Sequence, residues 1–309
     1  MKGQQRRTNE LLEKALEQLA QQRPLMLAAI LSSEGSSPRG KGAAMLCGPD
    51  GLLCGSVGGG SLEERCIALS REFLASSHSC VMEFTLGKAS SQLPDMLCGG
   101  SVRIAFICLS ADPGRWAAAL QQALQTLERG EDAILDLNDF GQLAIPALTQ
   151  VYVFGGGHCA FALVPILARI GFRVCVVDDR SAFADPQRFP DAEKVFCCPY
   201  SQISEHIRLT EDDYAIVMTS GHTHDLEVLE QILKGPFAYL GCMGSRGKAA
   251  ALNARLLEKG FDPQTVGRVL TPIGLAIGSQ TPEEIAVSIA AQLISFRAQK
   301  RKEKETLQR

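Results

Sequence analysis

The feature that most constrains the fold is a run of three glycines between a predicted strand and a predicted helix. Gly155–Gly157 follow the apolar residues 151–154 and, with Ala160, satisfy the pattern G-x-G-x-x-A; Asp178 stands at the end of the next predicted strand. Such glycines allow close backbone approach, the helix N-terminus attracts phosphate, and the acid can accept from a ribose hydroxyl. The run favours a Rossmann-type domain that holds a nucleotide-like ligand, either a dinucleotide or a pterin phosphate. The alternative is a Rossmann domain whose loop no longer binds one.

The pattern around this run is a regular alternation of strands and helices. Predicted strands cover residues 151–154, 173–178, 194–197, 214–219 and 237–240. Short apolar runs separated by helical stretches are typical of a doubly wound parallel sheet. We therefore expect an α/β fold with a Rossmann-like domain over residues 149–309, preceded by an N-terminal α/β domain over residues 1–148.

The N-terminal half mixes helices and strands less regularly. We expect helices over residues 8–22, 62–74 and 115–128, and strands over residues 25–31, 43–47, 52–54, 80–86, 101–109 and 133–137. Ser61 is the expected N-cap of the second helix. A further apolar helix, 281–298, would either pack on the core or form the face of a homodimer.

Charge and cysteine usage exclude several classes of protein. Lys and Arg number 31 against 34 Asp and Glu, a net charge of −3 that provides no basic field for nucleic acid. No apolar run approaches the roughly 20 residues of a membrane span, and the N-terminus lacks a signal-peptide pattern. The eleven cysteines are an odd number without a C-x-x-C pair, so neither a disulfide framework nor a structural zinc site is expected. We expect a cytoplasmic protein.

Two loops in the N-terminal half concentrate residues suited to an anionic ligand. The first, Gly35–Gly42, carries two hydroxyls and two cations: Ser36, Ser37, Arg39 and Lys41. The second contains Gly58, Gly59 and Gly60 and is followed by Glu63 in the first helical turn. Hydroxyls, cations and exposed backbone N–H groups bind phosphate and oxo groups, although tight turns with ordinary capping would look alike. Cys98, before the pair Gly99-Gly100, is the cysteine most suited to metal ligation, unless it is a half-buried structural residue.

Three further groups follow predicted strands of the Rossmann-like domain. His158 opens the helix after the triple glycine, His222 begins the stretch His222–Asp225, and Ser245 and Arg246 follow a later strand. Doubly wound folds place ligands at the carboxyl ends of their strands. We expect ligand contact or helix capping there rather than a metal site. Arg180 would equally suit a 2′-phosphate, so the sequence leaves the choice between NAD and NADP open.

Together these motifs resemble the XdhC/CoxI family, accessory proteins of xanthine dehydrogenase and related molybdenum hydroxylases. The resemblance rests on both N-terminal loops, Cys98–Gly100, the triple glycine with Asp178–Arg180, Gly244–Arg246, Pro272–Leu275 and Thr281–Ala286. It implies a chaperone without catalytic residues of its own, which binds the molybdenum cofactor (molybdopterin), supports its sulfuration by a cysteine desulfurase and delivers it to a xanthine dehydrogenase-type hydroxylase. The cofactor would lie in a cleft between the N-terminal loops and the carboxyl ends of the Rossmann strands.

One departure from the family pattern bears on the metal. Some relatives carry Cys after the glycines of the second loop, where this chain has Ser61. Sulfur ligation there is excluded, and Cys98 becomes the thiol candidate for molybdenum. The alternative function is an NAD(P)-dependent oxidoreductase with His158 or His222 as acid or base.

Overall fold

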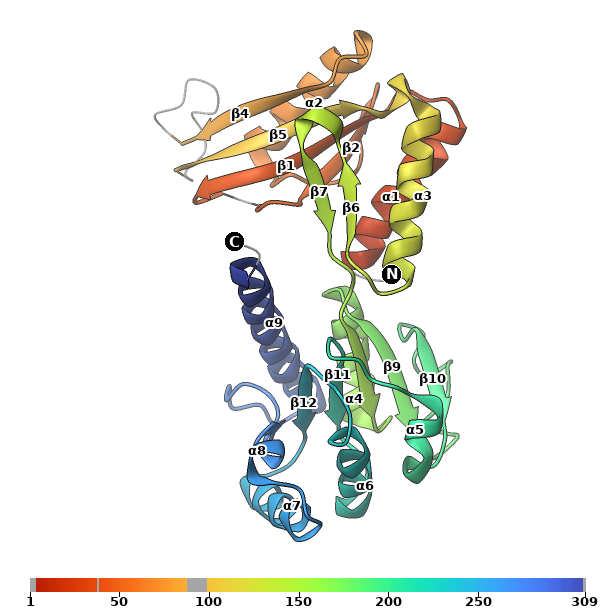
Figure 1. Ribbon diagram of the computed structural model, residues 1–309, viewed down its shortest axis with the longest axis vertical. Coiled ribbons are helices and arrows are strands. Elements are labelled where there is room, and N and C mark those ends of the chain that lie inside the picture. Colours follow the sequence, from red (N-terminus) through yellow and green to blue (C-terminus); the bar gives the residue numbers. More distant parts are fainter. Residues whose placement is uncertain (1–3, 38, 88–98, 308–309) are drawn as a thin grey trace. The chain divides into compact units, whose positions relative to one another are not determined.

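The computed structural model describes residues 4–37, 39–87 and 99–307, and they divide into two compact units. One unit comprises residues 5–148 and the other residues 149–309. Figure 1 traces the first from red to yellow-green and the second from green to blue. Each unit has its own hydrophobic core.

The N-terminal unit is built on an antiparallel sheet. Its helices are α1 (Gln4–Ala20), α2 (Gly60–Ala75) and α3 (Pro113–Glu128). Its strands are β1 (Met26–Gly35), β2 (Ala44–Gly48), β3 (Gly51–Gly55), β4 (Cys80–Leu86), β5 (Gly100–Cys108), β6 (Ala133–Asp136) and β7 (Gln142–Ile145). Short 3-10 turns cover Leu109–Ala111 and Asn138–Phe140. Five strands pair in the order β3-β2-β1-β5-β4, and β6 and β7 form a separate hairpin.

Alternation along β1 explains how this sheet is covered on both faces. Leu27 and Ala29 point into a core with α1, α3 and the β6–β7 hairpin, whereas Met26, Ala28 and Ile30 face α2. Side chains of a strand point alternately to opposite faces, so an almost continuous apolar run is buried on both. Figure 1 shows α1 and α3 side by side on their face.

The C-terminal unit is a doubly wound sheet. Its helices are α4 (His158–Arg169), α5 (Ile203–His206), α6 (His222–Ile232), α7 (Arg246–Glu258), α8 (Pro263–Val266) and α9 (Pro282–Leu307). Its strands are β8 (Gln150–Phe154), β9 (Arg173–Asp178), β10 (Lys194–Cys197), β11 (Tyr214–Val217), β12 (Tyr239–Cys242) and β13 (Val269–Leu270); a 3-10 turn covers Tyr200–Gln202. All are parallel, in the order β10-β9-β8-β11-β12-β13, which is the Rossmann arrangement.

Helices cover both faces of this sheet. α4 and α9 share one core with β8, β9 and β11, while α6 and α7 pack on the opposite face. The order of strands reverses between β8 and β11, which both lie in the middle of the sheet. The loops that follow these two strands, at Gly155 and Thr219, therefore flank the switch point where open α/β sheets bind ligands.

The mixed α/β class with a Rossmann-like sheet is confirmed, but several details of the sequence prediction are wrong. Ser61 lies inside α2, and the N-cap is Gly59, without a side-chain cap. The strand expected over residues 237–240 is β12, two residues later, and neither β7 nor β13 was predicted. Phe237 is buried in the turn before β12, and an apolar run alone does not separate such a residue from a strand.

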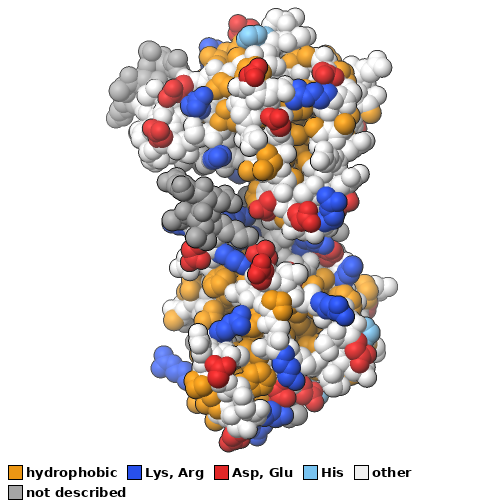
Figure 2. All heavy atoms as spheres, viewed as in Figure 1, with side chains coloured by type: hydrophobic (Ala, Val, Ile, Leu, Met, Phe, Trp, Pro, Cys, Tyr) orange, Lys and Arg blue, Asp and Glu red, His pale blue; other side chains and the backbone are white. Residues whose placement is uncertain are grey.

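Two surface properties bear on the expectations from composition. Among the described residues, no helix is long and apolar enough to cross a membrane. On the face drawn in Figure 2, acidic and basic side chains are interspersed over each unit.

Helix α9 buries one face in the core and exposes part of the other. The buried residues include Ala286, Ile289 and Leu293, and the exposed ones include Val287 and Ile294. The homodimer face expected on this helix stays a prediction.

Candidate functional site

In the N-terminal unit, strand pairing gathers the expected loops at one edge of the sheet. Gly35, the last residue of β1, pairs with Gly100, the first of β5. Gly55, the last residue of β3, pairs with Met45 at the start of β2. The loop after β1, the turn before β5 and the loop between β3 and α2 therefore all lie at the same end of the strands.

Close backbone contact requires glycine at two of these positions. A Cβ on Gly100 would lie 2.3 Å from the Glu34 carbonyl oxygen, and one on Gly35, at φ +68°, would lie 2.8 Å from the Gly99 oxygen. No side chain larger than hydrogen fits between these backbones. The turn after Cys98 is thereby fixed against the loop that carries Ser36. Cys98 itself and Pro38 lie outside the described residues.

The second glycine loop is bonded to Glu63 on one side and has space for a ligand on the other. Glu63 Oε2 accepts hydrogen bonds from Ser56 Oγ at 2.5 Å and from the Gly59 N–H at 3.3 Å. Gly58, Gly59 and Gly60 all have positive φ, and a Cβ on Gly59 or Gly60 would meet no atom within 4 Å. Glu63 thus orders the loop, while the backbone of Gly59 and Gly60 is open to a ligand.

The first loop presents its cations to solvent. Arg39 and Lys41 are exposed, as is Ser36, and the Ser37 hydroxyl donates to the Arg39 carbonyl at 3.0 Å. Neither cation forms an ion pair within the described residues. Two cations and an open glycine loop at one sheet edge suit an anionic ligand.

In the C-terminal unit, the triple glycine leads from β8 into α4. Gly155 has φ +109°, and its Cβ would lie 2.4 Å from the Met218 carbonyl oxygen. A Cβ on Gly156 would lie 2.3 Å from the Phe183 carbonyl oxygen, whereas one on Gly157 would meet no atom within 4 Å. Gly157 is the N-cap of α4 and provides no side-chain cap, and His158 is exposed. The loop is packed on its Gly156 side and open on its Gly157 side.

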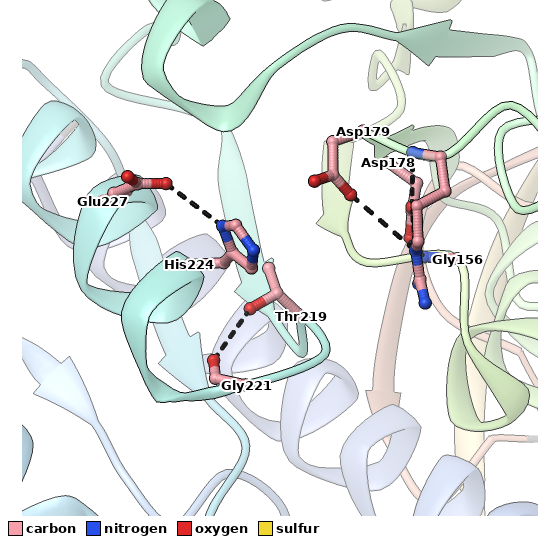
Figure 3. Close-up of polar contacts among 8 residues, drawn as sticks. Gly156, Asp178, Asp179, Thr219, Gly221, His224 and Glu227 are labelled. Carbon is pink, nitrogen blue, oxygen red and sulfur yellow. Dashed lines mark hydrogen bonds and ion pairs between the residues drawn. The ribbon is translucent and has the colours of Figure 1, made fainter.

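Asp178 is fully buried beneath this loop and bonded to protein groups. Its Oδ2 accepts from the Gly156 N–H at 2.7 Å and from Arg180 Nη2 at 2.9 Å; its Oδ1 accepts from the Arg180 N–H at 3.0 Å and from Nε at 2.8 Å. Burial raises the pKa of Asp178, but these hydrogen bonds outweigh it and the net pKa is lowered. Arg180 Nε also lies 3.7 Å from Asp179 Oδ1, and Figure 3 shows Asp178 and Asp179 close to Gly156. Asp178 orients the loop and Arg180; its expected contact with a ribose stays a prediction.

A second buried carboxylate organises the loop after β11. Asp225 Oδ1 accepts from the Thr219 N–H at 3.1 Å and from its hydroxyl at 2.6 Å, and Oδ2 forms an ion pair with Lys248. Asp225 thus ties α6 and α7 to the loop and does not cap α6, whose N-cap is Gly221 without a side-chain cap. His222 begins α6, and the structure describes its backbone only.

Tyr200 is the residue of this edge that sequence reasoning missed. Its ring lies 5.4 Å from that of His224, which in turn contacts Glu227 through Nδ1 at 3.2 Å. The Tyr200 hydroxyl is buried without a hydrogen-bond partner among the described residues. Burial and the charges of Asp178 and Asp179 raise its pKa. Its place just after the predicted strand 194–197 is the one signal that could have drawn attention to it.

The remaining expected residues lie after β12. Ser245 is the N-cap of α7 and accepts from the Lys248 N–H at 3.2 Å, while Arg246 is exposed at the start of that helix. Within the described part of the chain, no three His, Cys, Asp or Glu residues are arranged to hold a metal ion. The edge offers N–H groups, an exposed cation and hydroxyls, a set suited to phosphate rather than to a metal.

Comparison with known proteins identifies relatives of both units. The family model described as the XdhC Rossmann domain matches residues 151–293, and that of the XdhC and CoxI family matches residues 18–85. The Escherichia coli K12 protein YqeB is 24% identical, covering 89% of this chain and 44% of its own length, so this chain spans less than half of that relative.

Two relatives of similar length have more specific names. A Bacillus subtilis 168 protein named as a probable xanthine dehydrogenase subunit is 26% identical, with 90% of this chain and 95% of that protein covered. The molybdenum cofactor insertion chaperone PaoD of Escherichia coli K12 is 24% identical, with 93% and 88% covered. A crystal structure of a xanthine dehydrogenase from Bacillus halodurans has a TM-score of 0.77 at 23% identity, covers 92% of this chain and 96% of its own, and shows the same fold.

Proposed function

Because the chain belongs to the XdhC and CoxI family, we propose that it is an accessory protein that binds molybdenum cofactor and delivers it to a xanthine dehydrogenase-type hydroxylase. The name of PaoD, a molybdenum cofactor insertion chaperone, supports this role. The observation that carries the proposal is the gathering of three loops at one edge of the N-terminal sheet.

The chemistry of that edge fits an anionic cargo. Molybdenum cofactor carries a phosphate and oxygen ligands on its metal, and both favour cations and backbone N–H donors. Arg39, Lys41 and Ser36 are exposed there, and the backbone of Gly59 and Gly60 is open. We assign the phosphate to the glycine loop and α2 N-terminus, with Arg39 or Lys41 alongside. Cys98 would face the metal end.

We further propose that the bound cofactor receives its sulfido ligand from a cysteine desulfurase before delivery. The family resemblance supports this order, in which the accessory protein presents the metal end and shields it from water. The test is activation of an apo-hydroxylase with and without a desulfurase and a cysteine substrate. Activation that needs the accessory protein but not the desulfurase would remove the sulfuration step.

Binding is tested by incubating the full chain with freshly released molybdenum cofactor and measuring co-eluting molybdenum. We expect stoichiometric retention by the wild type and about tenfold weaker retention in Arg39→Ala, the typical value of one charge-assisted contact. Cys98→Ser should reduce delivery of active cofactor. Arg129→Ala is the control, since Arg129 is an exposed cation at the C-cap of α3 that lies near Glu131 and outside the three loops. Wild-type protein that retains no molybdenum would overturn the proposal.

The same retention assay tests whether the cofactor phosphate binds instead at the carboxyl ends of the Rossmann strands. We propose that a phosphorylated ligand binds at the carboxyl ends of β8, β11 and β12, where it contacts Gly157, His158, His222, Ser245 and Arg246. Loss of retention in Arg246→Ala but not in Arg39→Ala would move the cofactor phosphate to the Rossmann unit. The reverse result would leave it at the N-terminal edge.

A further inference from the structure

A dinucleotide makes two kinds of contact with a Rossmann unit. Its pyrophosphate contacts the glycine loop and the helix N-terminus, and the ribose of its first nucleoside donates to the acid at the end of the second strand. For that contact the carboxylate must have free lone pairs and a path to the ligand. In this unit the acid is Asp178, the last residue of β9.

The acceptor sites of Asp178 are filled by donors of the protein itself. An ionised carboxylate offers about four acceptor sites. Asp178 accepts one hydrogen bond from Gly156 and three from Arg180, and none of its surface is exposed. The Arg180 guanidinium therefore occupies the position that a ribose diol takes in a dinucleotide complex.

The residues that follow, 180–189, close the same side of the glycine loop. The Arg180 guanidinium lies 3.8 Å from the centroid of the Phe183 ring, and the Phe183 carbonyl contacts Gly156. Arg188 Nε donates to the Gly156 carbonyl at 3.4 Å, and its guanidinium lies 4.9 Å from the Phe161 ring on α4. Three of these contacts join the segment to the glycine loop or to α4 and hold it where the first nucleoside would lie, whereas the Gly157 side stays open.

We propose that Arg180 is a specificity-determining residue. It occupies the part of the Rossmann unit where the first nucleoside of a dinucleotide would bind, and it thereby excludes NAD and NADP. The unit then binds only ligands that lie between Gly157 and the N-terminus of α6. Such ligands place no nucleoside against Asp178. This inference goes beyond the proposed accessory function and does not rest on it, because it concerns ligand choice by one unit.

The test is titration of the full chain with NADH and NADPH, followed by nicotinamide fluorescence. We expect no saturation of the wild type below about 1 mM, and at least tenfold tighter NADH binding by Arg180→Ala, since about two charge-assisted hydrogen bonds become available to the ribose. Arg208→Ala, an exposed cation of the same unit, is the control and should behave as wild type. Circular dichroism confirms that each variant is folded.

Two results would overturn the proposal. One is saturable NADH binding by the wild type that Arg180→Ala leaves unchanged. The other is NADPH binding by the wild type that is lost in Arg180→Ala, because Arg180 would then bind a 2′-phosphate. If Arg180→Ala does not fold, Arg180→Gln provides the same test, since the shorter, uncharged glutamine side chain lacks the paired donors of a guanidinium.

Discussion

The two glycine loops have the same sequence signature, a strand followed by glycines and a helix, but they are held differently. The Gly58–Gly60 loop is fixed by one carboxylate, Glu63, and its upper side is open. The Gly155–Gly157 loop is fixed by Asp178 and also covered by residues 180–189. A glycine loop before a helix therefore predicts close backbone approach, but neighbouring segments decide whether a ligand or the protein itself makes that approach.

The largest expected effect is the loss of stability on substituting a packed glycine of the Gly155–Gly157 loop. Gly156→Ala should lower the free energy of unfolding of the C-terminal unit by about 3 kcal/mol, because the new Cβ meets a backbone carbonyl. Gly60→Ala, in open space at φ +59°, should cost the N-terminal unit only about 1 kcal/mol.

The two units can be followed separately in the full chain. Trp116, the one tryptophan, is buried in the N-terminal core, so its fluorescence reports that unit alone. Calorimetry reports both. A Gly156→Ala loss below 1 kcal/mol, or one that moves the Trp116 transition instead, would contradict the close packing on Gly156.

A smaller effect compares the two carboxylates that hold the loops. Asp178→Asn should destabilise the C-terminal unit by about 2 kcal/mol and Glu63→Gln the N-terminal unit by about 1 kcal/mol, since Asp178 is fully buried and Glu63 is not. Denaturant unfolding at pH 7 measures both. Equal losses would show that the Gly155–Gly157 loop is held no more tightly than the Gly58–Gly60 loop.

The contribution of Asp178 to the free energy of unfolding should also depend on pH. Its folded-state pKa lies below the ordinary value of 3.8, so the unfolded chain binds the proton more readily. The stabilisation is complete above the ordinary pKa and is lost as pH falls through the folded-state pKa. The difference between wild type and Asp178→Asn should therefore be full above about pH 5 and shrink as pH falls through the ordinary and then the folded-state pKa.

The smallest expected effect is an absence of reaction at buried thiols. Burial raises the pKa of Cys66 in the N-terminal unit and of Cys242 in the C-terminal unit to about 12 each. At pH 8 both should resist alkylation while the exposed Cys197 reacts. In Gly156→Ala the labelling of Cys242 should accelerate and that of Cys66 should not, as measured by peptide mass spectrometry. Equal acceleration would mean that the units do not open independently.

Much of the Rossmann unit could be predicted because its signals are local. The strands at 173–178 and 194–197 match β9 and β10, and the glycines lie where the pattern placed them. β13 was missed because two residues carry no periodicity, and β7 because its outward residues, such as Gln142, weaken the apolar signal. Tyr200 was missed because burial of a hydroxyl leaves no mark in the sequence beyond its place after a strand.

The sequence by itself determined the alternation of most strands and helices, the Rossmann class and the resemblance to the XdhC/CoxI family, since these rest on hydrophobic periodicity and on motifs of a few adjacent residues. Tertiary structure decided which loops share an edge, because the order β3-β2-β1-β5-β4 pairs strands far apart in the chain. It also decided what Asp178 binds. A motif specifies a buried acid beside a glycine loop, but a carboxylate takes whichever donors packing brings to it, and here packing brings Arg180.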